Sequence, residues 1–206
     1  MKDTDDKTRT PQQDRSIKTK QAIVTAAMEL FSNKGYHQTN TKQIAAAAGV
    51  STGSFYSYFT DKKAVFIEVL KYYNEALLSR VDASLAEINF DNNSDKKAVI
   101  SHLVDSLILS HQVYTGFHKE LSIMQLSDDE IKRLMDEQYN VGRQITLGYL
   151  QLDKEEVNVA DVEAAAIVVF ESVSTIVDAI VFSSRSIAAE RLKSELVNMI
   201  AKYLYD

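Results

Sequence analysis

The stretch from residue 41 to residue 63, TKQIAAAAGVSTGSFYSYFTDKK, predicts two short helices joined by a tight turn. In the first helix Ile44 is an apolar core position, and the small Ala48 lets a second helix cross closely. Gly49 stands where the first helix must end, because glycine adopts the left-handed backbone conformation at little steric cost. Val50 then returns to the core.

The second helix of this stretch is expected to begin at Ser51 or Thr52, either of which can cap its first turn. Phe55 and Phe59 are four residues apart and therefore share a buried face. The other faces carry small or hydroxyl-bearing side chains that can approach a DNA groove: Thr52, Ser54, Tyr56, Ser57 and Tyr58. This pattern is typical of a helix-turn-helix, whose second helix enters the major groove of DNA.

Charge is distributed unevenly along the chain. No acidic residue occurs between Glu29 and Asp61, whereas Lys34 and Lys42 lie inside that gap. Residues 1–66 hold 10 Lys and Arg against 6 Asp and Glu, a net charge of +4, while the remaining residues hold 13 against 23, a net charge of −10. The overall charge of −6 thus hides a basic segment suited to phosphates.

The segment AIVTAAMELFSNKGYHQTNTKQIAAAAGVSTGSFYSYFTDKKAVF resembles the N-terminal domain of the tetracycline-repressor (TetR) family, and the match spans about residues 16–70. Its most specific part is GVSTGSFYSYF, together with the LF that ends the preceding helix and the GY that follows. The rest of the chain is similar to the ligand-binding domains of that family only in length and helical character.

The resemblance implies roles for individual residues of the motif. Thr41, Thr52 and Gly53 would lie against bases or adjacent phosphates, Tyr56 and Tyr58 would contact the backbone, and Lys62 would meet a phosphate. Tyr58 and Lys63 stand where the family often has histidine and glutamate. The complete set expected to contact DNA is Thr41, Lys42, Ser51, Thr52, Gly53, Ser54, Tyr56, Ser57, Tyr58 and Lys62.

Composition favours an all-α protein, because the 206 residues include a single proline, Pro11, and only six glycines. The absence of cysteine excludes disulfides, thiol catalysis and cysteine metal sites. The longest apolar run, Ala164–Phe170, is too short to span a bilayer, and the N-terminus lacks the apolar core of a signal peptide. We therefore expect a cytoplasmic protein with no membrane partner.

From the N-terminus onward, the sequence predicts three segments. These are a disordered arm (residues 1–14), a helix-turn-helix DNA-binding domain (15–62) and a ligand-binding and dimerisation domain (63–206). The first helix should run from about Ser16 to Asn33, and residues 89–94 should form a loop. Ser127 and Glu130 predict a capping box, and Asn158 can cap the next helix. The last two helices have two faces to bury, which suggests a four-helix bundle across the two-fold axis of a homodimer.

A small-molecule site is expected in the larger domain. Its candidate residues are Tyr114, Phe117, His118, Met124, Tyr139, Phe170, Glu171 and Ser174. The cluster around His118 is equally compatible with plain core. Glu171 and Asp178 either recognise a cationic or hydrogen-bonding ligand or lie at a dimer interface or its solvated rim, and the second interpretation is favoured.

Neither a metal site nor catalysis is expected. The spacings of His102, His111 and His118 suit a metal poorly, because Gly116 should end a helix between the last two. No phosphate loop, HExxH or GxSxG motif is present, and no cofactor is implied. The sequence therefore predicts a dimeric repressor that a small-molecule effector releases from a pseudo-palindromic operator. The alternatives are a DNA-binding protein controlled by a protein partner, and a helical carrier or enzyme with a vestigial motif.

Overall fold

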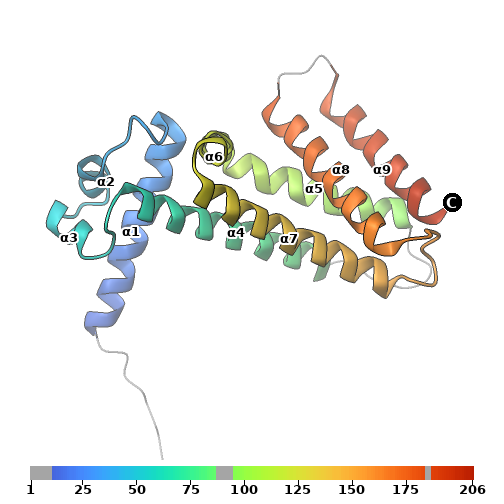
Figure 1. The fold of residues 1–206 in the computed structure, drawn as a ribbon, viewed down its shortest axis with the longest axis horizontal. Coiled ribbons are helices and arrows are strands. Elements are labelled where there is room, and N and C mark those ends of the chain that lie inside the picture. The colour runs from blue at the N-terminus through green and yellow to red at the C-terminus, as the bar shows by residue number, and fades with distance from the viewer. Residues whose placement is uncertain (1–10, 87–94, 184–186) are drawn as a thin grey trace, which may run out of the picture. The chain divides into compact units, whose positions relative to one another are not determined.

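The protein was analysed as a computed structural model that describes residues 11–86, 95–183 and 187–206, and these residues are helical with no strand (Figure 1). All-α was the predicted class, and it is confirmed. The helices are α1 (Pro11–Lys34), α2 (Thr41–Ala47), α3 (Thr52–Tyr56), α4 (Lys62–Ala86), α5 (Lys96–Val113), α6 (Thr115–Ser127), α7 (Asp129–Leu152), α8 (Val162–Phe182) and α9 (Ala189–Tyr205).

The chain divides into two compact units, Met1–Tyr72 and Tyr73–Asp206. The first unit extends beyond residue 62, where the sequence suggested a boundary, because the start of α4 supplies core residues to it. Val65 and Phe66 are fully buried, and the Phe66 ring lies 5.2 Å from the ring of Phe31 on α1.

The first unit has a core of aromatic side chains that pack directly on one another. The Tyr36 ring, in the loop after α1, lies 5.2 Å from Phe66, and the Phe55 ring of α3 lies 5.8 Å from Phe59. At the start of α2, Asn40 Oδ1 accepts from the backbone N–H of Gln43, and the backbone N–H of Asn40 donates to Gln43 Oε1. This pair of hydrogen bonds is a capping box. The two short helices are thus held by caps and by this core.

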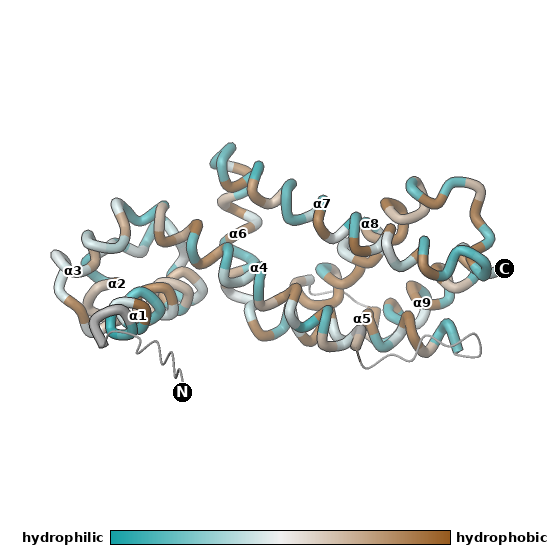
Figure 2. Tube along the Cα trace, turned by 90° about the horizontal axis from the view of Figure 1, so that it is seen from below, coloured by the Kyte–Doolittle hydropathy of each residue, from teal (hydrophilic) through white to brown (hydrophobic). Residues whose placement is uncertain are grey.

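In the second unit α8 packs against α5, α7 and α9. Figure 2 shows brown, hydrophobic stretches along α8 and α9. The described residues include one helix, α8, that is long and apolar enough to cross a membrane by length and composition. It supplies Ala165, Ala166, Val177 and Ala179 to the buried core of this unit. The buried cluster comprises Val104, Leu150, Ala165, Ala166, Val177, Leu196, Val197, Ile200 and Leu204.

Several predicted boundaries were wrong. Residues 11–14 belong to α1, which begins with Pro11 at a position where a helix needs no N–H; residues 1–10 and the predicted loop at 89–94 lie outside the described residues. Asp128, not Ser127, caps α7 by accepting from the N–H groups of Glu130 and Ile131. Asp161, not Asn158, caps α8.

The reason for the two capping errors is local competition between neighbouring polar residues. Ser127 is still inside α6, where its hydroxyl donates to the carbonyls of Ile123 and Met124. Asn158 is held elsewhere, since its backbone N–H donates to the carbonyl of Leu204. The carboxylates of Asp128 and Asp161, which follow one and three residues later, therefore cap α7 and α8.

Candidate functional site

The turn of the helix-turn-helix has the geometry that its sequence predicts. Gly49 has φ +69°, in the left-handed region. The N–H of Val50 reaches back to the carbonyl of Ala45 at 2.9 Å, which closes the end of α2. Ser51 then caps α3 by accepting from the N–H of Ser54 at 3.0 Å. The turn is therefore set by one glycine and one serine.

The predicted DNA-contacting residues share one region of the first unit. Lys42, Ser51, Gly53, Tyr56 and Ser57 are exposed, whereas Thr41, Thr52, Ser54 and Tyr58 are half-buried. The hydroxyls of Thr41 and Tyr56 lie 3.1 Å apart, so α2 and α3 meet at that point through polar groups. More than half of the Tyr56 side chain is accessible, which leaves it able to meet an external partner.

Gly53 has no structural need to be glycine. Its φ is not positive, and a Cβ added there would meet only the Ser51 hydroxyl at an ordinary 3.9 Å. Alanine would also favour the helix by about 1 kcal/mol relative to glycine. A side chain is therefore tolerated by the fold at this exposed point of α3, where a DNA backbone or base edge could approach closely.

Helix α1 also contributes to this face, which was not predicted from the sequence. Arg15, Ser16 and Thr19 line a shallow hollow together with Val50, Ser51, Ser54 and Tyr58. The hydroxyl of Tyr58 donates to that of Ser16 at 3.3 Å. The sequence did contain one signal for this contribution. Arg15 is a basic residue one helical turn before Thr19, on a helix that must pack against the helix-turn-helix.

Lys62 is engaged inside the first unit. Its ammonium donates to the carbonyls of Tyr36 and Thr39 at 2.7 and 2.9 Å and lies 4.0 Å from the centre of the Tyr36 ring. These bonds connect the loop between α1 and α2 to the start of α4. A phosphate at this residue would therefore have to share an ammonium that already has two carbonyl partners.

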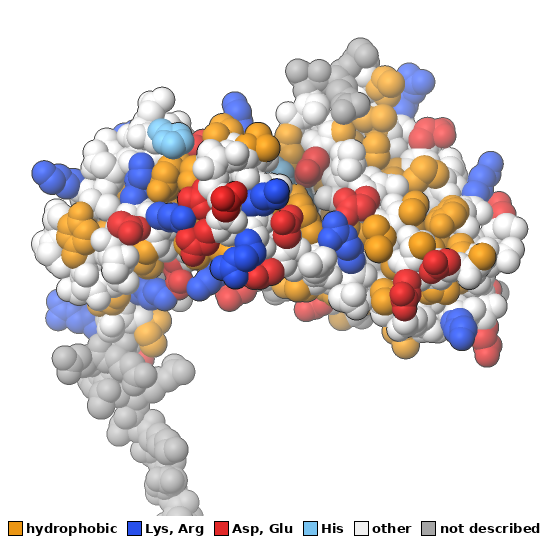
Figure 3. All heavy atoms as spheres, viewed as in Figure 1, with side chains coloured by type: hydrophobic (Ala, Val, Ile, Leu, Met, Phe, Trp, Pro, Cys, Tyr) orange, Lys and Arg blue, Asp and Glu red, His pale blue; other side chains and the backbone are white. Residues whose placement is uncertain are grey.

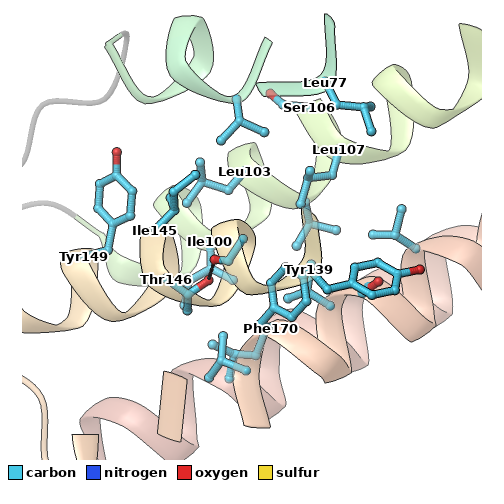
Figure 4. A pocket seen from close by; sticks show the side chains of 18 of the residues that line it. Leu77, Ile100, Leu103, Ser106, Leu107, Tyr139, Ile145, Thr146, Tyr149 and Phe170 are labelled. Carbon is cyan, nitrogen blue, oxygen red and sulfur yellow. Dashed lines mark hydrogen bonds between the residues drawn. The ribbon is translucent and has the colours of Figure 1, made fainter. Parts of the chain in front are cut away.

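The second unit contains an elongated cavity of about 580 Å³ between α4, α5, α7, α8 and α9. Figure 4 shows Leu103 and Leu107 from α5, Tyr139 and Ile145 from α7, and Phe170 from α8 around it. Most of the lining is aliphatic or aromatic. Lys96 and His111 both line it and are fifteen residues apart on α5, so the cavity follows that helix for about 22 Å.

The structure brings half of the predicted ligand residues to this cavity. His118, Tyr139, Phe170 and Ser174 line it, whereas Tyr114, Phe117, Met124 and Glu171 do not. Phe117 and Met124 are buried core residues, and the rings of Tyr114 and Phe117 each lie 5.6 Å from Tyr73. Glu171 points to the surface, where Arg143 Nε donates to it at 2.9 Å.

One end of the cavity is polar. Asp178, whose side chain is 35% exposed, lines it, and its Oδ1 lies 3.5 Å from His118 Nε2 and 3.9 Å from His111 Nε2. Burial lowers the pKa of His111, because a desolvated imidazolium is disfavoured. Burial also raises the pKa of Tyr73, with the charge of Asp178 adding to the effect.

The histidines meet despite their spacing. The chain breaks between α5 and α6 at Tyr114, and Gly116 lies inside α6, so the turn carries His118 back toward His111, 5.5 Å between ring centres. The prediction that Gly116 ends a helix between His111 and His118 was wrong, because Gly116 is the second residue of α6. His118 also stacks on Phe182 at 4.0 Å, which fixes its ring plane.

Two buried acceptor atoms line this cavity without a hydrogen-bond partner among the described residues: Asn74 Oδ1 and Asp178 Oδ1. Leaving a buried acceptor unsatisfied costs about 1–3 kcal/mol, and more for a charged group. At its other end the cavity is internally satisfied, since Asp153 accepts from Lys96 at 2.9 Å and from the Tyr205 hydroxyl at 2.8 Å. The polar end near Asp178 is therefore the part that lacks a partner.

Comparison with known proteins agrees with both halves of this arrangement. A family model described as bacterial regulatory proteins, tetR family, matches residues 23–69, which contain the helix-turn-helix. A second model, described as tetracyclin repressor-like, C-terminal domain, matches residues 97–204, which contain most of the cavity lining.

Curated relatives include two proteins of Bacillus subtilis. The HTH-type transcriptional regulator YuxN is 29% identical over 109 residues, which is 53% of this chain and 34% of that protein. The fatty acid metabolism regulator protein is 27% identical over 135 residues, 63% of this chain and 61% of that protein. The matched region thus spans less than two thirds of either relative.

Solved structures share the fold over nearly the whole chain. A transcriptional regulator from Saccharomonospora viridis in complex with choline has a TM-score of 0.72 at 16% identity, and covers 91% of this chain and 97% of its own. The fatty acid degradation regulator FadR from Bacillus halodurans has a TM-score of 0.67 at 22% identity, with 94% and 96% covered. With its DNA-binding motif and its C-terminal domain both matched, the chain belongs to the tetR family of DNA-binding transcriptional regulators.

Proposed function

We propose that this protein is a homodimeric repressor that leaves its operator when a small molecule occupies the cavity of the second unit. The observation that carries the proposal is the cavity itself, about 580 Å³ and lined mostly by apolar side chains. Small-molecule sites have such volumes and linings. A protein that only bound DNA would gain stability by filling this space.

The DNA contacts are assigned to the face of α2 and α3 together with the start of α1. In this assignment Thr52 and Gly53 approach the bases, while Thr41, Lys42, Tyr56 and Tyr58 meet the backbone. Arg15 joins them as a phosphate contact, since it is exposed and lines the same hollow as Ser51 and Ser54. Two such faces would reach successive major grooves if they stood about 34–36 Å apart.

The dimer is assigned to α8 and α9. Ile167 and Val168 on α8 are each 49% exposed, and Met199 on α9 is 48% exposed. Figure 3 shows hydrophobic side chains gathered over this part of the second unit. Apolar surface of this kind favours burial against a second copy, in which α8 and α9 would form a four-helix bundle. The homodimer would act in the cytoplasm.

The effector is assigned to elongated, mostly apolar molecules, of which a fatty acyl chain is the model compound. The support is the length of the cavity along α5 and its lining by residues such as Ile100, Leu103 and Leu107. The names of two relatives, a fatty acid metabolism regulator and a fatty acid degradation regulator, point to the same class.

Release would follow from differential affinity. The dimer would have one conformation whose two DNA-binding faces match the spacing of the major grooves and another whose faces do not. A ligand that binds the second conformation better shifts the population away from the one that binds DNA. A coupling of about 1–3 kcal/mol changes the affinity for DNA about 5- to 150-fold.

The test begins with selection of bound duplexes from a random pool by the full-length protein. Straight-chain fatty acids of increasing length and their acyl thioesters are then added to the selected complex. The proposal expects a two-fold symmetric sequence, bound by two chains and released by one member of the series. Selection that yields no preferred sequence would contradict the regulator, and a single bound chain would contradict the dimer.

A further inference from the structure

The polar end of the cavity contains two histidines and one aspartate from three helices: His111 on α5, His118 on α6 and Asp178 on α8. Each offers one ligand atom, and these atoms all lie within 4.8 Å of one another. No other group of three or more histidine, cysteine or acidic side chains with this geometry occurs among the residues that the structure describes.

The tautomer of His111 directs its lone pair toward Asp178. Its Nδ1 lies 2.8 Å from the carbonyl oxygen of Leu107, and a carbonyl can only accept, so Nδ1 carries the proton. Nε2 is then unprotonated in the neutral ring. This atom faces Asp178 Oδ1 at 3.9 Å.

His118 has a matching arrangement. Its Nδ1 lies 2.9 Å from the hydroxyl oxygen of Tyr73, which can accept a hydrogen bond from the ring N–H. Its Nε2 faces Asp178 Oδ1 at 3.5 Å. Histidines that bind metals usually donate their other N–H to an oxygen in this manner, which fixes the ring and raises its basicity.

The distances fit a shared ion better than direct hydrogen bonds. Both separations from Asp178 Oδ1 exceed the range of about 2.7–3.2 Å for N–H···O bonds. Two ligands at about 2.1 Å from Zn²⁺ and at the tetrahedral angle stand about 3.4 Å apart. The 3.5 Å between Asp178 Oδ1 and His118 Nε2 matches this spacing, while the 3.9 Å to His111 Nε2 would have to shorten when an ion binds. In addition, Asp178 Oδ1 is buried and lacks a hydrogen-bond partner among the described residues.

We propose that His111 Nε2, His118 Nε2 and Asp178 Oδ1 bind a divalent transition-metal ion at the polar end of the cavity. Two imidazoles and one carboxylate suit zinc, iron, cobalt or nickel, in preference to magnesium or calcium, which prefer oxygen ligands. The three protein ligands leave a further coordination position open, and the same residues line the cavity. The ion could therefore contact a bound molecule directly. The site stands independently of the proposed effector.

The test uses full-length, tag-free protein that has been treated with a chelator and dialysed. Co²⁺ is titrated and followed by its visible absorption, and the Zn²⁺ content is measured after equilibrium dialysis. We expect one ion per chain. The visible absorption of bound Co²⁺ should have the intensity of a four- or five-coordinate site with nitrogen ligands, not of the six-coordinate aqueous ion. His118→Gln and Asp178→Asn should each lower the affinity about 100-fold or more, since each removes a ligand, whereas losing a residue that only hydrogen-bonds a ligand costs about 10- to 100-fold.

Matched controls lie in the same unit. His102→Gln and Asp105→Asn make the same chemical changes at exposed positions of α5 and should leave Co²⁺ binding unchanged. Tyr73→Phe should keep the stoichiometry but weaken binding about 10- to 100-fold, because it removes only the acceptor for His118. Circular dichroism establishes that each variant is folded.

A second readout guards against variants that fail to fold. Zn²⁺ should raise the melting temperature of the wild-type protein and leave that of Asp178→Asn unchanged. Absence of Co²⁺ and Zn²⁺ binding in the folded wild type would overturn the proposal. So would binding that survives both ligand substitutions, since the ion would then be held elsewhere. Neither result bears on operator release, which is measured with DNA and fatty acids.

Discussion

Aromatic side chains fill the core of the first unit of this protein, whereas in the second unit some of them line a cavity. In the first unit the rings of Phe31, Tyr36 and Phe66 pack on one another within 5.6 Å and fill the core, as Tyr73 and Phe117 also do in part of the second unit. In the second unit Tyr139 and Phe170 stand 6.1 Å apart beside a cavity of about 580 Å³. The first arrangement supports α2 and α3 on a filled core, whereas the second leaves space for a small molecule.

The difference has a cost and a use. Close-packed interiors contain few voids larger than a water molecule, and an unfilled cavity forfeits contacts along its whole wall. The first unit must present α2 and α3 in one geometry, so a filled core serves it. The second unit retains a cavity, which the ligand response proposed for it would require.

The largest expected contrast comes from one chemical change made in both units. Leu70→Ala removes a side chain that is 1% exposed in the first unit and should lower the free energy of unfolding by about 3–5 kcal/mol. Leu103→Ala, at the cavity wall, should cost about 2 kcal/mol or less, because that side chain already has contacts on fewer sides. Urea denaturation of both variants measures this. Equal losses would mean that the cavity is filled in solution.

Gly49→Val tests the turn in the first unit. No atom lies within 4 Å of an added Cβ, so its cost of about 1–3 kcal/mol would come from the positive φ alone. Affinity for a selected duplex should collapse, while hydrogen exchange in α8 and α9 should be unchanged. Full DNA affinity in this variant would remove the helix-turn-helix from the account.

Arg15→Gln should weaken binding to all duplexes alike and reduce the slope of log affinity against log salt by about one, as expected for one lost phosphate contact. The control is Lys97→Gln, which removes the same charge from an exposed position of the second unit. The measurement is fluorescence anisotropy at several salt concentrations. A changed sequence preference would show that Arg15 reads bases.

Gly53→Ala has the smallest expected effect on folding. The added methyl group meets nothing closer than 3.9 Å, so the free energy of unfolding should not fall, and the better helix propensity of alanine should raise it by at most about 1 kcal/mol. Affinity for the selected duplex should nevertheless fall, since the methyl group would stand between α3 and the groove. Unaltered affinity would mean that Gly53 does not approach the DNA.

The features that the sequence predicted correctly depend on short-range signals. Gly49, the Ser51 cap and the Phe55–Phe59 pair each act within a few residues, so one sequence is enough to find them. Pro11 was a signal of the same kind that was read as part of an arm, although proline favours the first turn of a helix.

The polar end of the cavity depends on long-range packing and could not be found this way. His111 and His118 meet because the chain turns at Tyr114, and Asp178 joins them from α8, sixty residues after His118. A two-sided hydrophobic pattern on α8 did not say which side faces a cavity and which a partner. Only the positions of α5, α7 and α9 around it decide that.

The most direct test of the central claim asks whether filling the cavity with a side chain blocks release. Val173→Phe places a ring at the cavity lining, and Val113→Phe makes the same change at a residue that is 53% exposed on α5. Affinity for the selected duplex is measured with and without the most effective fatty acid. We expect that compound to weaken DNA binding about 5- to 150-fold in the wild type and in Val113→Phe, and not in Val173→Phe. Equal release of all three proteins, or a fatty acid that binds the cavity without changing DNA affinity, would contradict the account.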